Sequence, residues 1–71
     1  MPGKLKKIQE LVEMLKKEGK DVTPQAIMSR AMTYATSVVG SPHEKEKYSG
    51  VTSGLISQYL RYVAEHPTVP S

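Results

Sequence analysis

The chain has 71 residues, no cysteine, and ten Lys and Arg against seven Asp and Glu, which gives a net charge of +3. A single domain of this size buries only about 60% of the surface that its unfolded chain exposes, so its stability margin is small. Because disulfides and thiolate metal sites are excluded, packed helices have to supply the stability, and a dimer interface could add to it.

A first amphipathic helix is predicted over residues 4–18, and Gly19 ends it. Apolar residues recur there at the three- and four-residue spacing of one buried stripe: Leu5, Ile8, Leu11, Val12 and Leu15. The opposite face carries charges, which we interpret as solvated.

A second helix is predicted to begin after Thr23 as N-cap, with Pro24 at its first position, and to end at Gly40. One face is apolar, and it is made of Ile27, Ala31, Tyr34, Ala35 and Val38, with Met28 and Met32 widening it. The β-branched residues near 36–39 leave short strand pairing open as an alternative.

Residues 41–44 form a capping box, in which the Ser41 hydroxyl and the Glu44 carboxylate can satisfy each other's backbone amides. The segment that follows is polar and offers little to bury, so it is predicted to be either one exposed helical turn or a loop. Tyr48, at its end, is expected to be exposed.

The last helix is predicted from Thr52 to about His66, where Pro67 blocks it. Its buried arc comprises Val51, Leu55, Ile56, Tyr59, Leu60, Tyr62 and Val63. The fold class is therefore all-α: a small bundle of three long helices plus a short helical turn. We expect one domain over residues 1–66 and a frayed C-terminal tail over 67–71.

Residues 50–60 resemble the turn and recognition helix of helix-turn-helix regulators such as the lactose-repressor family: a Gly and a Val in the turn, a hydroxyl N-cap, and then Ile-Ser-Gln-Tyr-Leu. Residues 23–31 resemble the first helix of the same motif, but eighteen residues, 32–49, stand between the two halves. Either the motif is split by an extended second helix and the capped turn, or one half is accidental. Reading 42–47 as the first helix is disfavoured, because Lys45 and Glu46 stand where an apolar residue is wanted.

The resemblance implies that the helix from Thr52 lies in a major groove of DNA. Residues opposite its buried arc would then read base edges: Ser53, Gly54, Ser57, Gln58 and Arg61. Phosphate contacts would come from Thr52, Lys6, Lys7, Lys16, Lys17, Lys20, Arg30, Lys45 and Lys47. A solvated outer face of an amphipathic helix would have the same periodicity.

Other kinds of site have weaker support. His43, Glu44 and Glu46 match no recognised metal-ligand spacing, so we expect no metal and no cofactor. A hydrolytic triad lacks its Gly-x-Ser-x-Gly turn, and no enzyme activity is expected. Among the tyrosines, Tyr34, Tyr59 and Tyr62 lie on predicted core arcs, so Tyr48 alone is a candidate to stack on an unpaired base.

The sequence therefore predicts a small DNA-binding protein, a repressor or nucleoid-type factor that acts in the cytoplasm and forms a homodimer, because one recognition helix reads few base pairs. The positive charge fits this partner. The alternative is a helical protein-interaction module that docks a partner helix on Met28 and Met32.

The apolar stretches are too short to cross a membrane, and the lysines after Met1 run into an amphipathic helix instead of a signal peptide. The DNA sequence, the choice between DNA and RNA and the oligomeric state are left open.

Overall fold

The computed structural model describes residues 3–36 and 41–66, and within them the chain forms four α-helices and no strand. These helices are α1 (Gly3–Lys17), α2 (Pro24–Thr36), α3 (Pro42–Ser49) and α4 (Ser53–Glu65). The predicted all-α class is confirmed, as three longer helices and one short one. The predicted end of the second helix at Gly40, the strand pairing near 36–39 and the tail 67–71 lie outside the described residues.

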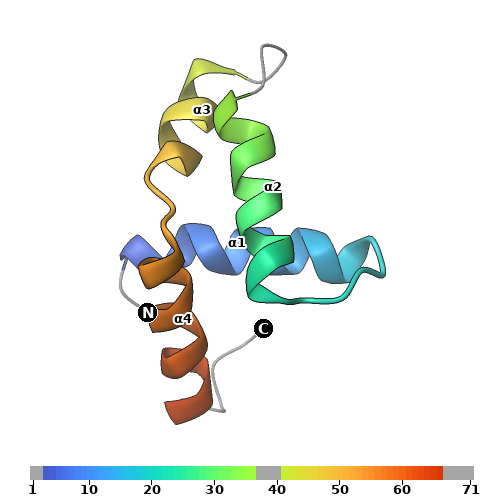
Figure 1. Cartoon of the computed structure of the whole chain (residues 1–71), viewed down its shortest axis with the longest axis vertical. Helices are drawn as coiled ribbons and strands as arrows, with labels where there is room; N and C mark the ends of the chain where they lie inside the picture. Colours follow the sequence, from blue (N-terminus) through green and yellow to red (C-terminus); the bar gives the residue numbers. More distant parts are fainter. Residues whose placement is uncertain (1–2, 37–40, 67–71) are drawn as a thin grey trace.

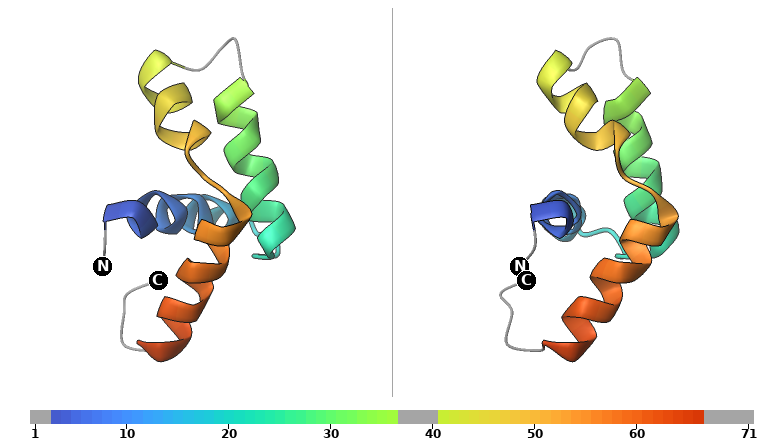
Figure 2. Two further views of the ribbon diagram at one scale, coloured as in Figure 1. Left: turned by 60° about the vertical axis from the view of Figure 1, so that its left-hand side comes forward. Right: turned by 90° about the vertical axis from the view of Figure 1, so that its left-hand side faces the viewer.

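The helices are arranged around α1, which lies across the direction of α2 and α4 (Figure 1). From the level of α1, α2 runs one way, α3 returns beside it, and α4 continues beyond α1 in the opposite direction to α2 (Figures 1 and 2). The molecule is accordingly elongated, with extents of 36 × 25 × 18 Å. The far half of α4 projects from the body (Figure 2).

The sequence signals that delimit the helices are present in the structure. Gly19 has φ +73°, and the Gly19 and Lys20 amides donate to the carbonyls of Lys16 and Leu15, at 3.0 and 2.9 Å. This pattern is a Schellman motif, which needs a residue that tolerates the left-handed region. At the start of α2, the Thr23 hydroxyl accepts a hydrogen bond from the Ala26 amide at 3.1 Å, as expected of an N-cap.

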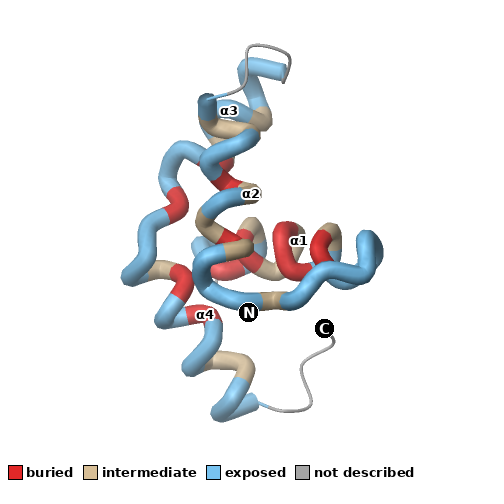
Figure 3. Tube along the Cα trace, turned by 45° about the vertical axis from the view of Figure 1, so that its right-hand side comes forward, coloured by how far each residue is buried: buried red, intermediate tan, exposed pale blue. Residues whose placement is uncertain are grey.

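The core lies where α1 packs against α2 and α4, and α3 adds Tyr48 to it (Figure 3). All five stripe residues predicted on α1 are buried, and they contact residues of the other helices to form one cluster. The buried members of this cluster are Leu5, Ile8, Leu11, Val12, Leu15, Ile27, Ala31, Tyr48, Val51, Ile56 and Tyr59. This cluster fixes the position of α4 relative to α1.

The segment predicted as one exposed helical turn or a loop is an eight-residue helix, Pro42–Ser49, and none of its polar residues 43–47 is buried, as predicted. Ser41 caps α3, because its hydroxyl accepts from the Glu44 amide at 3.2 Å. Tyr48, expected to be exposed, is only 3% exposed. Its ring lies 5.1 Å from that of Tyr34, and its hydroxyl donates to Glu10 at 3.3 Å. The Tyr48 ring thus anchors α3 to α2 and α1.

Two other predicted faces need correction. Leu60, placed on the buried arc of the last helix, is 36% exposed, and Met32, placed on the widened apolar face of the second, is 55% exposed. In both cases the side chain lies at the border of the apolar arc, where no neighbouring helix of the described chain covers it.

Candidate nucleic-acid interface

Helix α4 is held firmly at its start. Val51 in the preceding turn is 8% exposed, and its amide donates to the Tyr48 carbonyl at 3.2 Å. The Thr52 hydroxyl then accepts from the Leu55 amide at 3.1 Å, which confirms the predicted N-cap. Beyond the cap, Ile56 and Tyr59 are the buried residues of α4. Burial also raises the pKa of the Tyr59 hydroxyl, which therefore stays protonated at neutral pH.

The backbone conformation of the turn before α4 does not require a glycine. Gly50 has φ −85° and ψ 0°, a conformation open to any residue. What distinguishes the position is a neighbour, because a Cβ atom added to Gly50 would lie 3.4 Å from Lys7 Nζ. The ammonium group of Lys7 therefore sits beside the turn that leads into α4, although the two residues are far apart in the sequence.

The five residues predicted to read bases are all exposed, but they do not share one direction. Ser53 and Ser57 lie on the side of α4 that faces α2. Gly54, Gln58 and Arg61 lie on the outward side, at intervals of four and three residues. Neither the Gln58 nor the Arg61 side chain makes a hydrogen bond or ion pair with any residue in the ranges 3–36 and 41–66. Their polar groups are available to a ligand.

Three of the cations that were predicted to contact phosphates form ion pairs with carboxylates of this chain. Arg30 donates two hydrogen bonds to Glu18, at 2.7 and 2.5 Å, and Lys20 Nζ lies 3.4 Å from the same carboxylate. This arrangement lowers the pKa of Glu18 to about 2, chiefly through the hydrogen bond from Arg30, and raises the pKa of Arg30. Lys47 is paired with Glu10, and this hydrogen bond raises the pKa of the Lys47 ammonium. The cations on α2 and α3 are thus partly neutralised.

The remaining phosphate candidates have no carboxylate partner within the described part of the chain. They are Lys6, Lys7, Lys16 and Lys17 on α1, and Lys45 on α3. Lys7 is the one that the structure brings next to the start of α4, together with the exposed Thr52. Lys45 belongs to α3, at the other end of the molecule from α4 (Figure 1).

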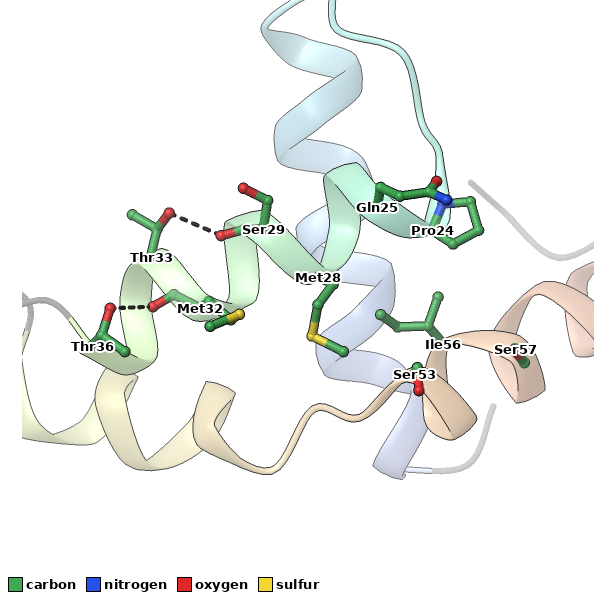
Figure 4. Close-up of a pocket in the computed structure, with 10 residues that line it drawn as sticks. All are labelled: Pro24, Gln25, Met28, Ser29, Met32, Thr33, Thr36, Ser53, Ile56 and Ser57. Carbon is green, nitrogen blue, oxygen red and sulfur yellow. Dashed lines mark hydrogen bonds between the residues drawn. The ribbon is translucent and has the colours of Figure 1, made fainter.

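A groove of about 710 Å³ separates α2 from α4 (Figure 4). Ten residues line it, and none of these ten carries a charge: Pro24, Gln25, Met28, Ser29, Met32, Thr33, Thr36, Ser53, Ile56 and Ser57. The Thr33 and Thr36 hydroxyls donate to α2 carbonyls at 2.9 and 2.7 Å, which satisfies these donors within the helix. The groove therefore offers an uncharged and largely apolar surface.

No other part of the described chain gathers groups with an evident chemical role. His43 is exposed, and Glu44 Oε1 lies 3.3 Å from the Ser41 hydroxyl. No set of three or more His, Asp or Glu residues within the described ranges is placed to hold a metal ion. Of the helices described, none combines the length and apolar character that crossing a bilayer needs.

Comparison with known proteins does not supply a function. No protein-family model, no curated protein and no solved structure matches this chain.

Proposed function

We propose that the protein binds duplex DNA and places the outward side of α4 in the major groove. The observation that carries this proposal is that the exposed side chains of Gln58 and Arg61 have no partner among the described residues and belong to a helix whose orientation is fixed by the buried Ile56 and Tyr59. The other arginine, Arg30, is held by Glu18. Among the described residues, Arg61 is the guanidinium left free for an external acceptor.

The spacing on α4 suits a row of base pairs. Gly54, Gln58 and Arg61 follow one side of the helix over a rise of about 10 Å, close to the height of three stacked base pairs. A glutamine amide can pair bidentately with adenine, and a guanidinium can pair bidentately with guanine. Gly54 has no side chain to keep the helix backbone away from the bases.

Groups at the start of α4 are suited to the phosphate backbone. The amides in the first helical turn carry partial positive charge, and a nearby phosphate is stabilised by them. Lys7 lies beside the turn before α4, and Thr52 is exposed at the cap. Phosphate contacts fix the orientation of a protein on DNA without reading its sequence, which is the role we assign to these two residues.

The experiment compares substitutions on α4 with a charge-matched substitution elsewhere. Duplexes are first enriched from a random pool on the wild-type protein, and affinities are then measured by fluorescence anisotropy. We expect Arg61→Ala and Gln58→Ala each to weaken specific binding by about 1–3 kcal/mol. Arg61→Lys keeps the charge but cannot form the bidentate pair, so it should recover little of the specific affinity.

Lys45→Ala is the matched control. It removes one positive charge, as Arg61→Ala does, but from α3 at the opposite end of the molecule (Figure 1). We expect it to leave the preference among DNA sequences unchanged. If Arg61→Ala and Gln58→Ala bind the selected duplex as tightly as the wild type does, α4 is not the reading helix and the proposal fails.

The alternative function, a protein-interaction module without nucleic-acid binding, has one observation in its favour. The uncharged groove between α2 and α4 has no feature that attracts a polyanion, and it exposes the flexible Met32 side chain, which adapts to partner helices. A folded protein that binds no DNA at low salt would favour this alternative.

A further inference from the structure

The outward side of α4 carries one more charged group, Glu65, in line with the residues that are proposed to read bases. Gly54, Gln58, Arg61 and Glu65 follow one another at intervals of four, three and four residues, and all of them are exposed. At about 100° per residue, these positions lie within an arc of about 60° of the helix circumference. A duplex that contacts Gln58 and Arg61 therefore lies beside the Glu65 carboxylate as well.

The packing of α4 gives no reason for a carboxylate at this position. Glu65 is the last residue of α4, and the carbonyl end of a helix carries partial negative charge, which disfavours a carboxylate. The last turn of α4 holds no Lys or Arg to offset this charge. Arg61 stands one turn earlier, but no ion pair joins it to Glu65. A residue that breaks a local rule of stability without a compensating contact points to a role in function.

A carboxylate on the reading side is compatible with few groups of a duplex. It accepts hydrogen bonds and donates none, and phosphates repel it. In the major groove, guanine offers only acceptors, thymine offers an acceptor and a methyl group, and adenine offers an amine next to the acceptor N7. Cytosine offers its N4 amine without an acceptor of its own. A carboxylate held in the major groove therefore favours cytosine over the other bases.

The position of Arg61 indicates where that cytosine lies. Glu65 is about 6 Å beyond Arg61 along the helix axis, close to the height of two base-pair steps. We propose that Glu65 determines specificity: its carboxylate accepts a hydrogen bond from a cytosine N4 amine about two base pairs from the guanine that Arg61 reads, and it disfavours duplexes without that amine. The inference rests on the proposed binding of DNA by α4. It adds a penalty for wrong sequences to the attraction that Gln58 and Arg61 supply.

The matched variants are Glu65→Ala and Glu46→Ala. They remove the same charge from exposed positions, one on the outward side of α4 and one on α3 at the other end of the molecule (Figure 1). Fluorescence anisotropy compares a duplex enriched on the wild-type protein, the same duplex with the cytosine base pair replaced, and an unselected duplex. The guanine that Arg61 reads is the one whose replacement no longer weakens binding in Arg61→Ala.

For the wild type, we expect replacement of the cytosine base pair to weaken binding about fivefold or more. In Glu65→Ala this penalty should fall below about twofold, and the unselected duplex should bind at least about threefold more tightly at about 50 mM salt, because a repulsive charge is gone. Glu65→Gln keeps the side-chain length without the charge and should show the same gain for the unselected duplex. Glu46→Ala should behave as the wild type does in both measurements, and circular dichroism shows that each variant is folded.

The outcomes separate the role of Glu65 from DNA binding itself. If the wild type binds no duplex, or if Arg61→Ala binds the selected duplex as tightly as the wild type does, the proposed function fails and the role of Glu65 fails with it. If both of those tests succeed, three results overturn the role of Glu65 alone. They are a selected sequence without a cytosine at that distance from the guanine, a Glu65→Ala protein that keeps the cytosine preference or the wild-type affinity for unselected DNA, and an equal gain in Glu46→Ala, which would be an effect of net charge.

Discussion

Replacing Tyr48 by alanine removes the one buried side chain of α3. A buried aromatic ring covers roughly 150–250 Å², which at about 25 cal/mol per Å² is an upper limit of about 4–6 kcal/mol. Large-to-small changes of this kind cost about 3–5 kcal/mol. Because a chain of this size has only about 4–10 kcal/mol of stability in total, Tyr48→Ala should be at the edge of folding.

Tyr48→Phe separates the ring from its hydroxyl. The phenylalanine keeps the contact with Tyr34 and loses the 3.3 Å hydrogen bond to Glu10, whose carboxylate is partly exposed. We expect this variant to lose no more than about 1 kcal/mol. Its free energy of unfolding should therefore remain measurable even if the alanine variant is largely unfolded.

Urea unfolding followed by circular dichroism gives the free energies, and hydrogen exchange locates the change. In Tyr48→Ala the amides of α3 should exchange fastest, because no other α3 side chain is buried to hold the helix in place. If Tyr48→Ala costs less than about 1 kcal/mol, or if Tyr48→Phe costs as much as Tyr48→Ala, the ring does not anchor α3 and the reasoning is refuted.

Two further predictions concern the junction of α1 and α2. Gly19→Ala should destabilise the protein by about 1 kcal/mol in thermal unfolding, because Gly19 has φ +73°, whereas Gly3→Ala, with open space around it, should be neutral or slightly stabilising. An equal effect at both positions would contradict this. The pKa of Glu18 is lowered to about 2, chiefly by its hydrogen bond from Arg30. The stability from this pair should therefore be complete above about pH 4.5 and be lost as the pH falls towards 2, and Glu18→Gln should remove that part of the pH dependence seen in urea unfolding.

Local signals in the sequence predict the helices well. Thr23, Ser41 and Thr52 each accept a hydrogen bond from the first turn of the helix that follows, and Gly19 adopts the left-handed conformation at the end of α1. These features depend on a few neighbouring residues, so the sequence contains them in full. The α1 stripe is also predicted correctly, because its five residues are those that α1 contributes to the buried cluster.

The errors arise where burial depends on partners distant in the sequence. Tyr48 is buried because α3 folds back beside α2 and brings its ring against Tyr34, and no periodicity within a polar eight-residue helix reveals this. Met32 and Leu60 are exposed for the complementary reason, since helical spacing shows which residues share a side but not how wide the covered arc is.

In the candidate site, too, some features follow from the local sequence and others depend on distant partners. The exposure of Gly54, Gln58 and Arg61 follows from the periodicity of α4 and is predicted. The pairing of Arg30 with Glu18 and of Lys47 with Glu10, and the position of Lys7 beside Gly50, depend on packing between helices. Composition gives the net charge of the chain, but only the structure shows which cations are already paired.

The most direct test of DNA binding is the affinity of the wild-type protein for duplex DNA at several salt concentrations. Each phosphate neutralised contributes about 0.9 to the slope of log affinity against log salt. If Lys7, beside the turn before α4, and one or two further unpaired lysines of α1 each neutralise a phosphate, the slope is expected to be about −2 to −3, with measurable binding at about 50 mM salt. A protein that is folded by circular dichroism and yet shows no binding at that salt concentration, or binding that does not change with salt, would contradict the proposal.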